Sequence, residues 1–298
     1  MLGIINLNKP VGKTSHDMVA LVRCSLGIRR VGHTGTLDPA ASGVLPILVG
    51  KATGLSELLT DKTKRYTARV RVGIATDSYD TTGEITQKSD VRPTLEMVQA
   101  ACQSFLGTIR QVPPMYSAIK VGGKKLYELA RQGITIEREA REVTIHSLCC
   151  RDFTEDGFTL DVVCSKGTYI RSLCHDLGKA LGTCAAMESL VRTGSGMFTI
   201  EDAITPEELV RRAEAGDVAS FLLPPETVLA DYPAACLSPQ QGARVRNGLR
   251  YRLEQVGIKD GAEGSLYRLY EGDTLLCLSK AVPGEGSLVL AMEVGFYE

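Results

Sequence analysis

The stretch Tyr66-Thr-Ala-Arg-Val-Arg-Val-Gly-Ile74 alternates between two kinds of side chain. One set is mostly apolar and comprises Tyr66, Ala68, Val70, Val72 and Ile74. The other set comprises Thr67, Arg69 and Arg71. Because successive side chains of a β-strand point to opposite faces, the pattern predicts a strand with one face toward a core and one basic face.

Helical periodicity flanks this strand on both sides along the chain. Apolar residues three or four positions apart predict a helix over 16–26 capped by Ser15, a helix that begins at Thr94, and a helix from Ile170 to Leu181. Thr205-Pro206-Glu-Glu208 reads as a capping box and predicts a fourth helix start. A further strand is expected over 158–164.

The last third of the chain changes character. Pro224-Pro225 and the Asp231-Tyr-Pro233 turn indicate a domain boundary near 232. Beyond it, short alternating stretches are separated by Gly-rich turns, and they cover 249–256, 265–270, 274–280 and 287–297. This spacing predicts a small all-β barrel.

The charge is unevenly distributed along the 298 residues. The totals nearly cancel, with 34 Lys and Arg against 35 Asp and Glu. Residues 1–75, however, hold 11 basic against 4 acidic residues, whereas 201–232 hold 8 acidic against 2 basic residues. A polyanion responds to the local field, so a near-neutral total does not exclude a nucleic-acid partner.

Several classes of protein are disfavoured. No apolar run reaches the roughly 18 residues that a membrane span requires, and the first residues do not resemble a secretory signal. The nine cysteines are scattered without a C-x-x-C pair, and the four histidines show no ligand spacing, so no metal site is expected. Free thiols without a signal favour the cytoplasm.

Two segments are candidates for function. Gly32-His33-Thr-Gly35-Thr-Leu-Asp38-Pro39 places one carboxylate in a Gly-rich loop inside the basic N-terminal segment, although the spacing alone favours an Asp–Pro turn with a structural Asp. Residues 110–145 form a long polar excursion rich in Lys and Arg, with a short helix around 126–131. Long loops in compact domains are often functional.

Five motifs occur in an order that resembles the TruB family of bacterial tRNA pseudouridine-55 synthases. They are Asn6-Leu-Asn-Lys9-Pro10-x-Gly12-x-Thr-Ser15, Arg30-Val-Gly-His33-x-Gly35-x-Leu-Asp38-Pro, Lys64-Arg65-Tyr66, Gln111-x-Pro-Pro-x-Tyr116-Ser-Ala and Lys166-Gly-Thr-Tyr169-Ile-Arg171. The resemblance covers about 2–230. Residues 232–298 are similar, more weakly, to the small PUA-type RNA-binding domain of that family.

The resemblance implies an α+β fold. Residues 1–231 would form a catalytic domain with a mixed, largely antiparallel sheet, flanking helices and an RNA-gripping arm at 110–145, and 232–298 a PUA-like β-barrel. The implied reaction isomerises the T-loop uridine (U55) of tRNA to pseudouridine after flipping the base. Nothing enters or leaves, so neither a cofactor nor a metal is required.

The resemblance also implies roles for individual residues. Asp38 would be the catalytic carboxylate, Arg171 its partner, and Tyr66 would stack on the uracil. Tyr169 would line the pocket and Leu190 supply an apolar wall. His33 would fill the space that the flipped base vacates. Phosphates would be held by Lys9, Lys64, Arg65 and the basic part of the arm at 120–131.

Three functions remain open at this point. The first is a stand-alone, monomeric enzyme that binds the T-arm stem-loop of tRNA and needs no protein partner. The second is a guide-dependent pseudouridine synthase acting on other RNA, which the full arm disfavours. The third is a non-catalytic RNA-binding or tRNA-folding protein, which the joint presence of Asp38, Tyr66 and Arg171 disfavours.

Overall fold

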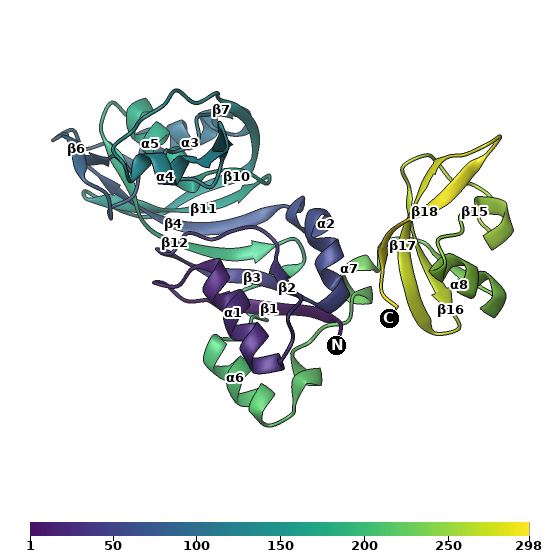
Figure 1. Ribbon diagram of the computed structural model, residues 1–298. Coiled ribbons are helices and arrows are strands. Elements are labelled where there is room, and N and C mark those ends of the chain that lie inside the picture. Colours follow the sequence, from purple (N-terminus) through teal and green to yellow (C-terminus); the bar gives the residue numbers. More distant parts are fainter. Residues whose placement is uncertain (298) are drawn as a thin grey trace.

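A nine-stranded mixed sheet organises the first two thirds of the chain, in a computed structural model that describes residues 1–297 (Figure 1). Its main path runs β1-β3-β12-β4-β11-β10-β7, and only β3 and β12 pair in parallel along that path. The strands are β1 (Gly3–Lys9), β2 (Val31–His33), β3 (Ala41–Val49), β4 (Lys64–Val72), β7 (Gly107–Gln111), β10 (Arg141–Thr154), β11 (Gly157–Cys164), β12 (Ala185–Ser195) and β13 (Phe198–Thr199). The α+β prediction is confirmed.

Four helices pack on this sheet. They are α1 (Ser15–Leu26), α3 (Leu95–Ser104), α5 (Ile170–Ala180) and α6 (Pro206–Glu214). In Figure 1, α1 and α6 lie beside β1 and β3, and α3 and α5 lie beside β10, β4 and β12. One buried apolar cluster joins side chains of α1, α3 and α5 to side chains of the central strands. Removal of these apolar side chains from water is the main stabilising contribution to the fold.

Two helix starts differ from the sequence expectation. Thr14, not Ser15, caps α1, and it forms a reciprocal capping box with Asp17. Ser15 is buried one position later. Thr205 caps α6 as expected, but the Glu208 carboxylate pairs with Arg211 and Arg212 instead of closing the box.

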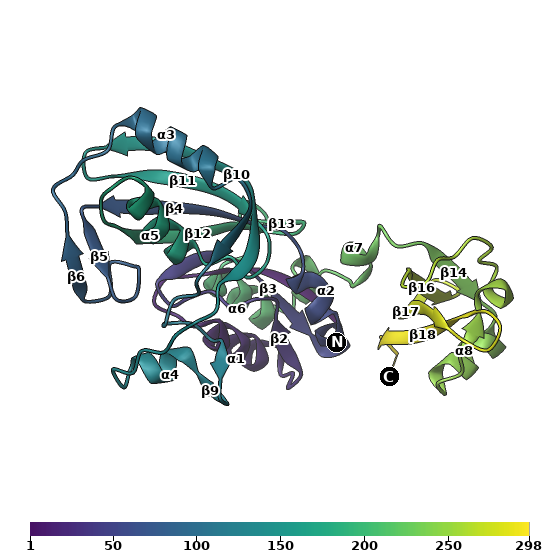
Figure 2. The same cartoon turned by 90° about the horizontal axis from the view of Figure 1, so that it is seen from above.

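Two excursions leave the sheet. A hairpin of β5 (Ile74–Thr76) and β6 (Ile85–Lys88) follows β4. The polar excursion spans 112–140, because 110–111 and 141–145 are paired strands. This arm contains β8 (Lys120–Val121), β9 (Lys124–Lys125) and α4 (Leu126–Ala130), and it projects from the sheet in Figure 2.

The C-terminal unit is a curled sheet that forms a half-barrel, and it contains a helix in addition to the strands expected from the spacing. Its order is β14-β16-β17-β18-β15, with the two end strands unpaired to each other. The bounds are β14 (Ala234–Leu237), α8 (Pro239–Arg246), β15 (Tyr251–Arg252), β16 (Leu266–Glu271), β17 (Thr274–Pro283) and β18 (Leu288–Gly295). Most of 249–256 is not strand, because Leu253–Val256 forms the short 3₁₀ helix η3.

Apolar side chains of the C-terminal unit pack against apolar side chains of the N-terminal part in one buried cluster. Leu275, Leu278 and Phe296 belong to one buried cluster with Leu48 and Leu55 of the N-terminal part. The latter two come from β3 and from the 3₁₀ helix η1 (Gly50–Leu55), which is continued by α2 (Ser56–Thr60). The connection runs through η2 (Val218–Ser220) and α7 (Glu226–Leu229), and α7 is seen between the two units in Figure 1.

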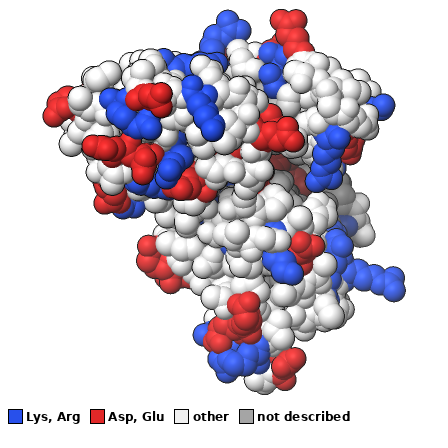
Figure 3. Space-filling view, turned by 90° about the vertical axis from the view of Figure 1, so that its left-hand side faces the viewer, with Lys and Arg blue, Asp and Glu red and all other residues white. Residues whose placement is uncertain are grey.

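The polar face of β4 is less basic than the sequence predicts. Arg69 lies 3.7 Å from the Glu188 carboxylate, Arg71 lies 4.0 Å from Asp156, and the Thr67 hydroxyl donates to Asp161 over 2.6 Å. Two neighbouring strands and the turn between β10 and β11 supply these acids, which a one-strand pattern cannot reveal. Figure 3 shows basic and acidic side chains interspersed on one side of the molecule.

Candidate active site

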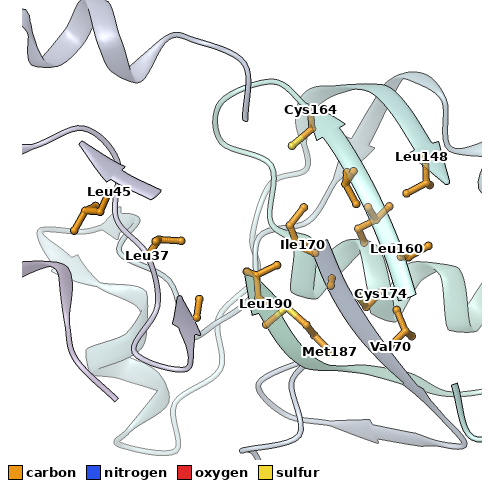
Figure 4. Close-up of a cluster of buried hydrophobic side chains, with 14 of the residues drawn as sticks. Leu37, Leu45, Val70, Leu148, Leu160, Cys164, Ile170, Cys174, Met187 and Leu190 are labelled. Atoms are coloured by element: carbon orange, nitrogen blue, oxygen red, sulfur yellow. The ribbon is translucent and has the colours of Figure 1, made fainter. Parts of the chain in front are cut away.

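The loop between β2 and β3 presents Asp38. Leu37 is buried in the main apolar cluster, as Figure 4 shows, and Ser15 holds its backbone from α1. The Ser15 hydroxyl accepts from the Leu37 amide over 2.9 Å and donates to its carbonyl at 3.2 Å. The next side chain, Asp38, is 42% exposed. An anchored neighbour therefore places a solvent-facing carboxylate.

Arg171 meets this carboxylate from the first turn of α5. Ile170 is buried in the same apolar cluster as Leu37 (Figure 4), which fixes the start of the helix. The Arg171 side chain is only 5% exposed, and its Nη2 lies 2.8 Å from Asp38 Oδ2. The structure thus brings together two residues 133 positions apart in a charge-assisted contact.

The same guanidinium has three further partners, which the sequence analysis missed. Asp80 Oδ2 lies 3.7 Å from Nη1, the Ser78 carbonyl accepts at 3.1 Å, and the Tyr116 carbonyl accepts at 2.7 Å. Asp80 is buried and also accepts from the Ser78 hydroxyl and the Thr82 amide. No local signal in the sequence marks Ser78 or Asp80 as a partner of Arg171.

Tyr79, between Ser78 and Asp80, adopts a left-handed backbone with φ of 64°. Such a conformation costs a bulky residue on the order of 1–3 kcal/mol. The cost is offset by neighbours: the Tyr79 ring stacks on His175 of α5 at 4.0 Å, and its carbonyl accepts from Met187. The turn aims both the Ser78 carbonyl and the Asp80 carboxylate at Arg171.

Two tyrosines and one leucine surround the pair. Tyr66 is half-buried on β4, and burial raises the pKa of its phenol. Burial and the nearby Asp38 charge likewise raise the pKa of Tyr169, so both phenols are protonated at neutral pH. The Gln111 side chain clamps the Tyr169 backbone with two hydrogen bonds of 2.7 and 3.0 Å. Leu190 is buried in the apolar cluster.

Lys9 and Lys64 do not face solvent, which corrects the expectation that they hold phosphates. The Lys9 ammonium donates to the carbonyls of Pro10 and Lys13, and the Lys64 ammonium donates to three carbonyls over 59–62. Burial lowers the pKa of each to about 8. Lys64 uses all three of its N–H donors on these carbonyls and Lys9 uses two of its three, and both side chains are buried, so neither presents its ammonium at the surface to an RNA phosphate.

The sequence analysis also missed a third buried cation, Arg192. It is 1% exposed and donates to the carbonyls of Val44 and Gly35 over 2.6 and 3.3 Å. These carbonyls flank the Asp38 loop on both sides. Arg192 of β12 lies opposite Tyr66 of β4 in the strand pairing. The pKa of His33 is lowered mainly by burial, then by the charge of His16 and then by the charge of Arg192.

The remaining expected contacts lie nearer the surface. His33 is half-buried and meets the His16 ring edge-on at 5.8 Å. Arg65 is partly exposed and covers the backbone of Gly194. In the arm, Lys120, Lys124 and Arg131 are exposed, and Lys125 and Arg131 both lie 5.4 Å from the Tyr127 ring centre.

The buried cysteine on α5 stays outside the site chemistry. Cys174 is fully buried, and burial raises the pKa of its thiol to about 12, so it is not a nucleophile. All nine cysteines are unpaired. Within residues 1–297, no helix is long and apolar enough to cross a membrane.

Comparison with solved structures places this architecture among the pseudouridine synthases. A complex titled "Structure of H/ACA RNP bound to a substrate RNA containing 2'-deoxyuridine" matches with a TM-score of 0.74 and 26% identity, covering 99% of this chain and 85% of that chain. A Cbf5-Nop10-Gar1 complex matches with a TM-score of 0.73 and 29% identity, covering 99% and 84%. The chain aligns over 99% of its length with each of these structures, and its curled C-terminal sheet fits a PUA-like half-barrel.

Sequence comparison narrows the class. The N-terminal domain of the TruB family pseudouridylate synthases matches residues 23–170, and the tRNA pseudouridylate synthase B C-terminal domain matches 171–230. The tRNA pseudouridine synthase B of Alkaliphilus oremlandii is 44% identical over 271 residues, 90% of each chain. That of Geobacillus kaustophilus is 47% identical over 276 residues, 90% of this chain and 97% of its own. The chain belongs to the TruB family.

Proposed function

We propose that this protein is a stand-alone tRNA pseudouridine synthase that isomerises U55 in the T-loop. Family membership supports the reaction. The observation that carries the proposal is the Asp38–Arg171 ion pair, in which a buried guanidinium fixes a carboxylate that is 42% exposed. A carboxylate held in one place yet open to RNA is what the reaction needs near the sugar.

The isomerisation breaks the N1–C1′ bond, turns the uracil and joins C5 to C1′. C5 loses its proton and N1 gains one, so atoms and electrons balance within the nucleotide and water. Asp38 acts at the sugar or the base: attack on either, or removal of the C2′ proton, starts from the same ionised, accessible carboxylate. Arg171 orients it. A ring such as Tyr66 stacks on a base for about 1–3 kcal/mol.

Docking of the T-arm is assigned to exposed cations. Lys120, Lys124 and Arg131 of the arm, together with Arg65, carry charges that phosphates can neutralise. His33 would occupy the stacking position left by the flipped base, and Leu190 would bound the pocket. Residues 232–298 would act as a PUA-like RNA-binding domain beside the catalytic domain of 1–231. A monomer acting in the cytoplasm on tRNA is the simplest form of this proposal.

The guide-dependent alternative is less well supported. The related solved structures contain further proteins, Nop10 and Gar1, by their titles. This chain instead has its own cationic arm of 112–140, anchored at the catalytic pair through Tyr116 and Gln111. A non-catalytic RNA-binding protein would have no need for the buried acceptors that orient Arg171.

The Asp38→Asn protein tests the proposal. Its rate of pseudouridine formation in a T-arm transcript should be at least about 10³-fold below that of wild type, because an amide neither attacks carbon nor takes a proton. RNA affinity should stay within about twofold. Asp90→Asn, an exposed carboxylate change elsewhere, is the matched control. The assay contains EDTA and no cofactor. Absence of product with the wild-type protein would refute the proposed pseudouridine synthase activity. An active Asp38→Asn protein would refute the role of Asp38 as the catalytic carboxylate.

A further inference from the structure

The foot of the arm is attached directly to the catalytic arginine. The last residue of β7 and the first residues of the arm bind the start of α5 at three places: the Gln111 side chain clamps Tyr169, the Val112 carbonyl accepts from Ser172 at 2.9 Å, and the Tyr116 carbonyl accepts from Arg171 at 2.7 Å. Arg171 therefore divides its donors between Asp38 and the arm. A shift of the arm foot would disturb the guanidinium that orients the carboxylate.

A second bond holds this foot from the other side. The Tyr116 hydroxyl donates to Asp77 Oδ2 over 3.2 Å, and Asp77 begins the turn that also carries Ser78 and Asp80. Asp77 is itself fixed, since its Oδ1 accepts from the Glu84 amide at 2.9 Å. The Asp77 side chain is also tightly packed against the turn, because a Cβ on Gly83 would lie 2.2 Å from Asp77 Oδ1.

These contacts form a closed ring. Arg171 binds the Tyr116 carbonyl, the Tyr116 hydroxyl binds Asp77, and the residue after Asp77 returns its carbonyl to Arg171 at 3.1 Å. Backbone and side chain of one tyrosine thus join three segments: α5, the turn after β5, and the arm. Only the Tyr116–Asp77 bond in this ring can be removed without altering Arg171 or a backbone group.

We propose that Tyr116 and Asp77 are positioning residues that lock the RNA-gripping arm to the Arg171–Asp38 pair. This lock is the Tyr116–Asp77 hydrogen bond. Because Tyr116 also binds Arg171, the bond couples the position of the arm to the orientation of the Asp38 carboxylate. The arm tip keeps its own geometry, because β8 pairs with β9 and the Tyr127 amide is bound by the Ser117 carbonyl. Loss of the lock therefore lowers the rate in bound RNA and leaves the grip intact. This inference rests on the proposed function.

The test is a double-mutant cycle on single-turnover pseudouridine formation. Tyr116→Phe and Asp77→Ala should each lower the rate at saturating protein by about 3- to 10-fold, with the Kd for the T-arm within about twofold. The double variant should be no slower than the slower single variant. Asp77→Asn should restore most of the rate, because the amide oxygen can accept from Glu84 and the amide nitrogen can donate to the Tyr116 oxygen.

Thr199→Val is the matched control and should retain the wild-type rate, because it removes a hydroxyl that donates to the Asp202 carboxylate over 2.9 Å, away from the site, the arm and the C-terminal unit. Hydrogen exchange gives a readout independent of catalysis: amides around 112–119 should exchange faster in Tyr116→Phe than in wild type. Unchanged rates in both single variants, additive effects in the double variant, or a weakened Kd with an unchanged rate would each overturn the proposal. An inactive wild-type protein would instead refute the proposed function, and the exchange measurement would still stand.

Discussion

At the scale of single residues, the Asp38 loop depends on a hydroxyl from another element. Ser15 is 2% exposed, and its Oγ satisfies both backbone groups of Leu37. Ser15→Ala should lower the free energy of unfolding by about 1–3 kcal/mol, because it leaves a buried amide unpaired, and should slow turnover without weakening RNA binding. Chemical denaturation and single-turnover assays check this, with the exposed Ser104→Ala as control. Wild-type stability and rate would contradict it.

The residues that the sequence analysis missed share a physical reason. Asp38, Tyr66 and Arg171 belong to ordered motifs and could be named from the sequence. Asp80 and Arg192 could not, because their importance lies in contacts across 91 and 148 positions of chain. A buried ionisable group is recognised by what surrounds it, and those surroundings exist only after the strands are ordered. Long-range pairing of this kind leaves no periodic signal.

At the scale of elements, the turn after β5 is pressed onto α5 by the Tyr79–His175 stack. Burial, and secondarily Lys179, lower the pKa of His175 to about 4, whereas an unfolded histidine has a pKa near 6.5. The unfolded state therefore binds more protons between these values, and stability is lost as the pH falls from about 6.5 toward 4. Between pH 7 and pH 5 this single group should remove about 2 kcal/mol. Denaturation of wild type and His175→Phe, which keeps a ring, measures it; parallel pH profiles would contradict it.

Element prediction succeeded where one face of an element is buried. The alternation over 66–74 correctly placed Ala68, Val70 and Val72 in the core. It failed for the opposite face, because the acids that neutralise Arg69 and Arg71 come from other strands and turns. Lys64 shows the same limit: its long side chain turns inward to carbonyls of α2 and the following turn, and nothing in the sequence distinguishes it from a solvated lysine.

At the scale of the whole molecule, the two units meet at a close contact between η1 and β18. Gly54 has an ordinary backbone conformation, but a Cβ there would lie 2.7 Å from Val294 Cγ1. Gly54→Ala should therefore lower the free energy of unfolding by about 1–3 kcal/mol through overpacking. Gly32→Ala is the control, since its nearest neighbour beyond the adjacent residues, Thr53 Cγ2, is 3.6 Å away.

Val294→Ala removes the obstructing methyl groups, so the Gly54→Ala/Val294→Ala protein should be more stable than the sum of the two single changes predicts. Thermal and chemical unfolding of the four proteins measures this coupling. RNA affinity measured on the same proteins shows whether the packing of residues 232–298 against η1 also sets the position of the C-terminal unit for binding. The added methyl group has no other space to occupy, so it must push Val294 away from Gly54. A Gly54→Ala protein as stable as wild type would therefore show that the contact between Gly54 and Val294 does not hold the two units together.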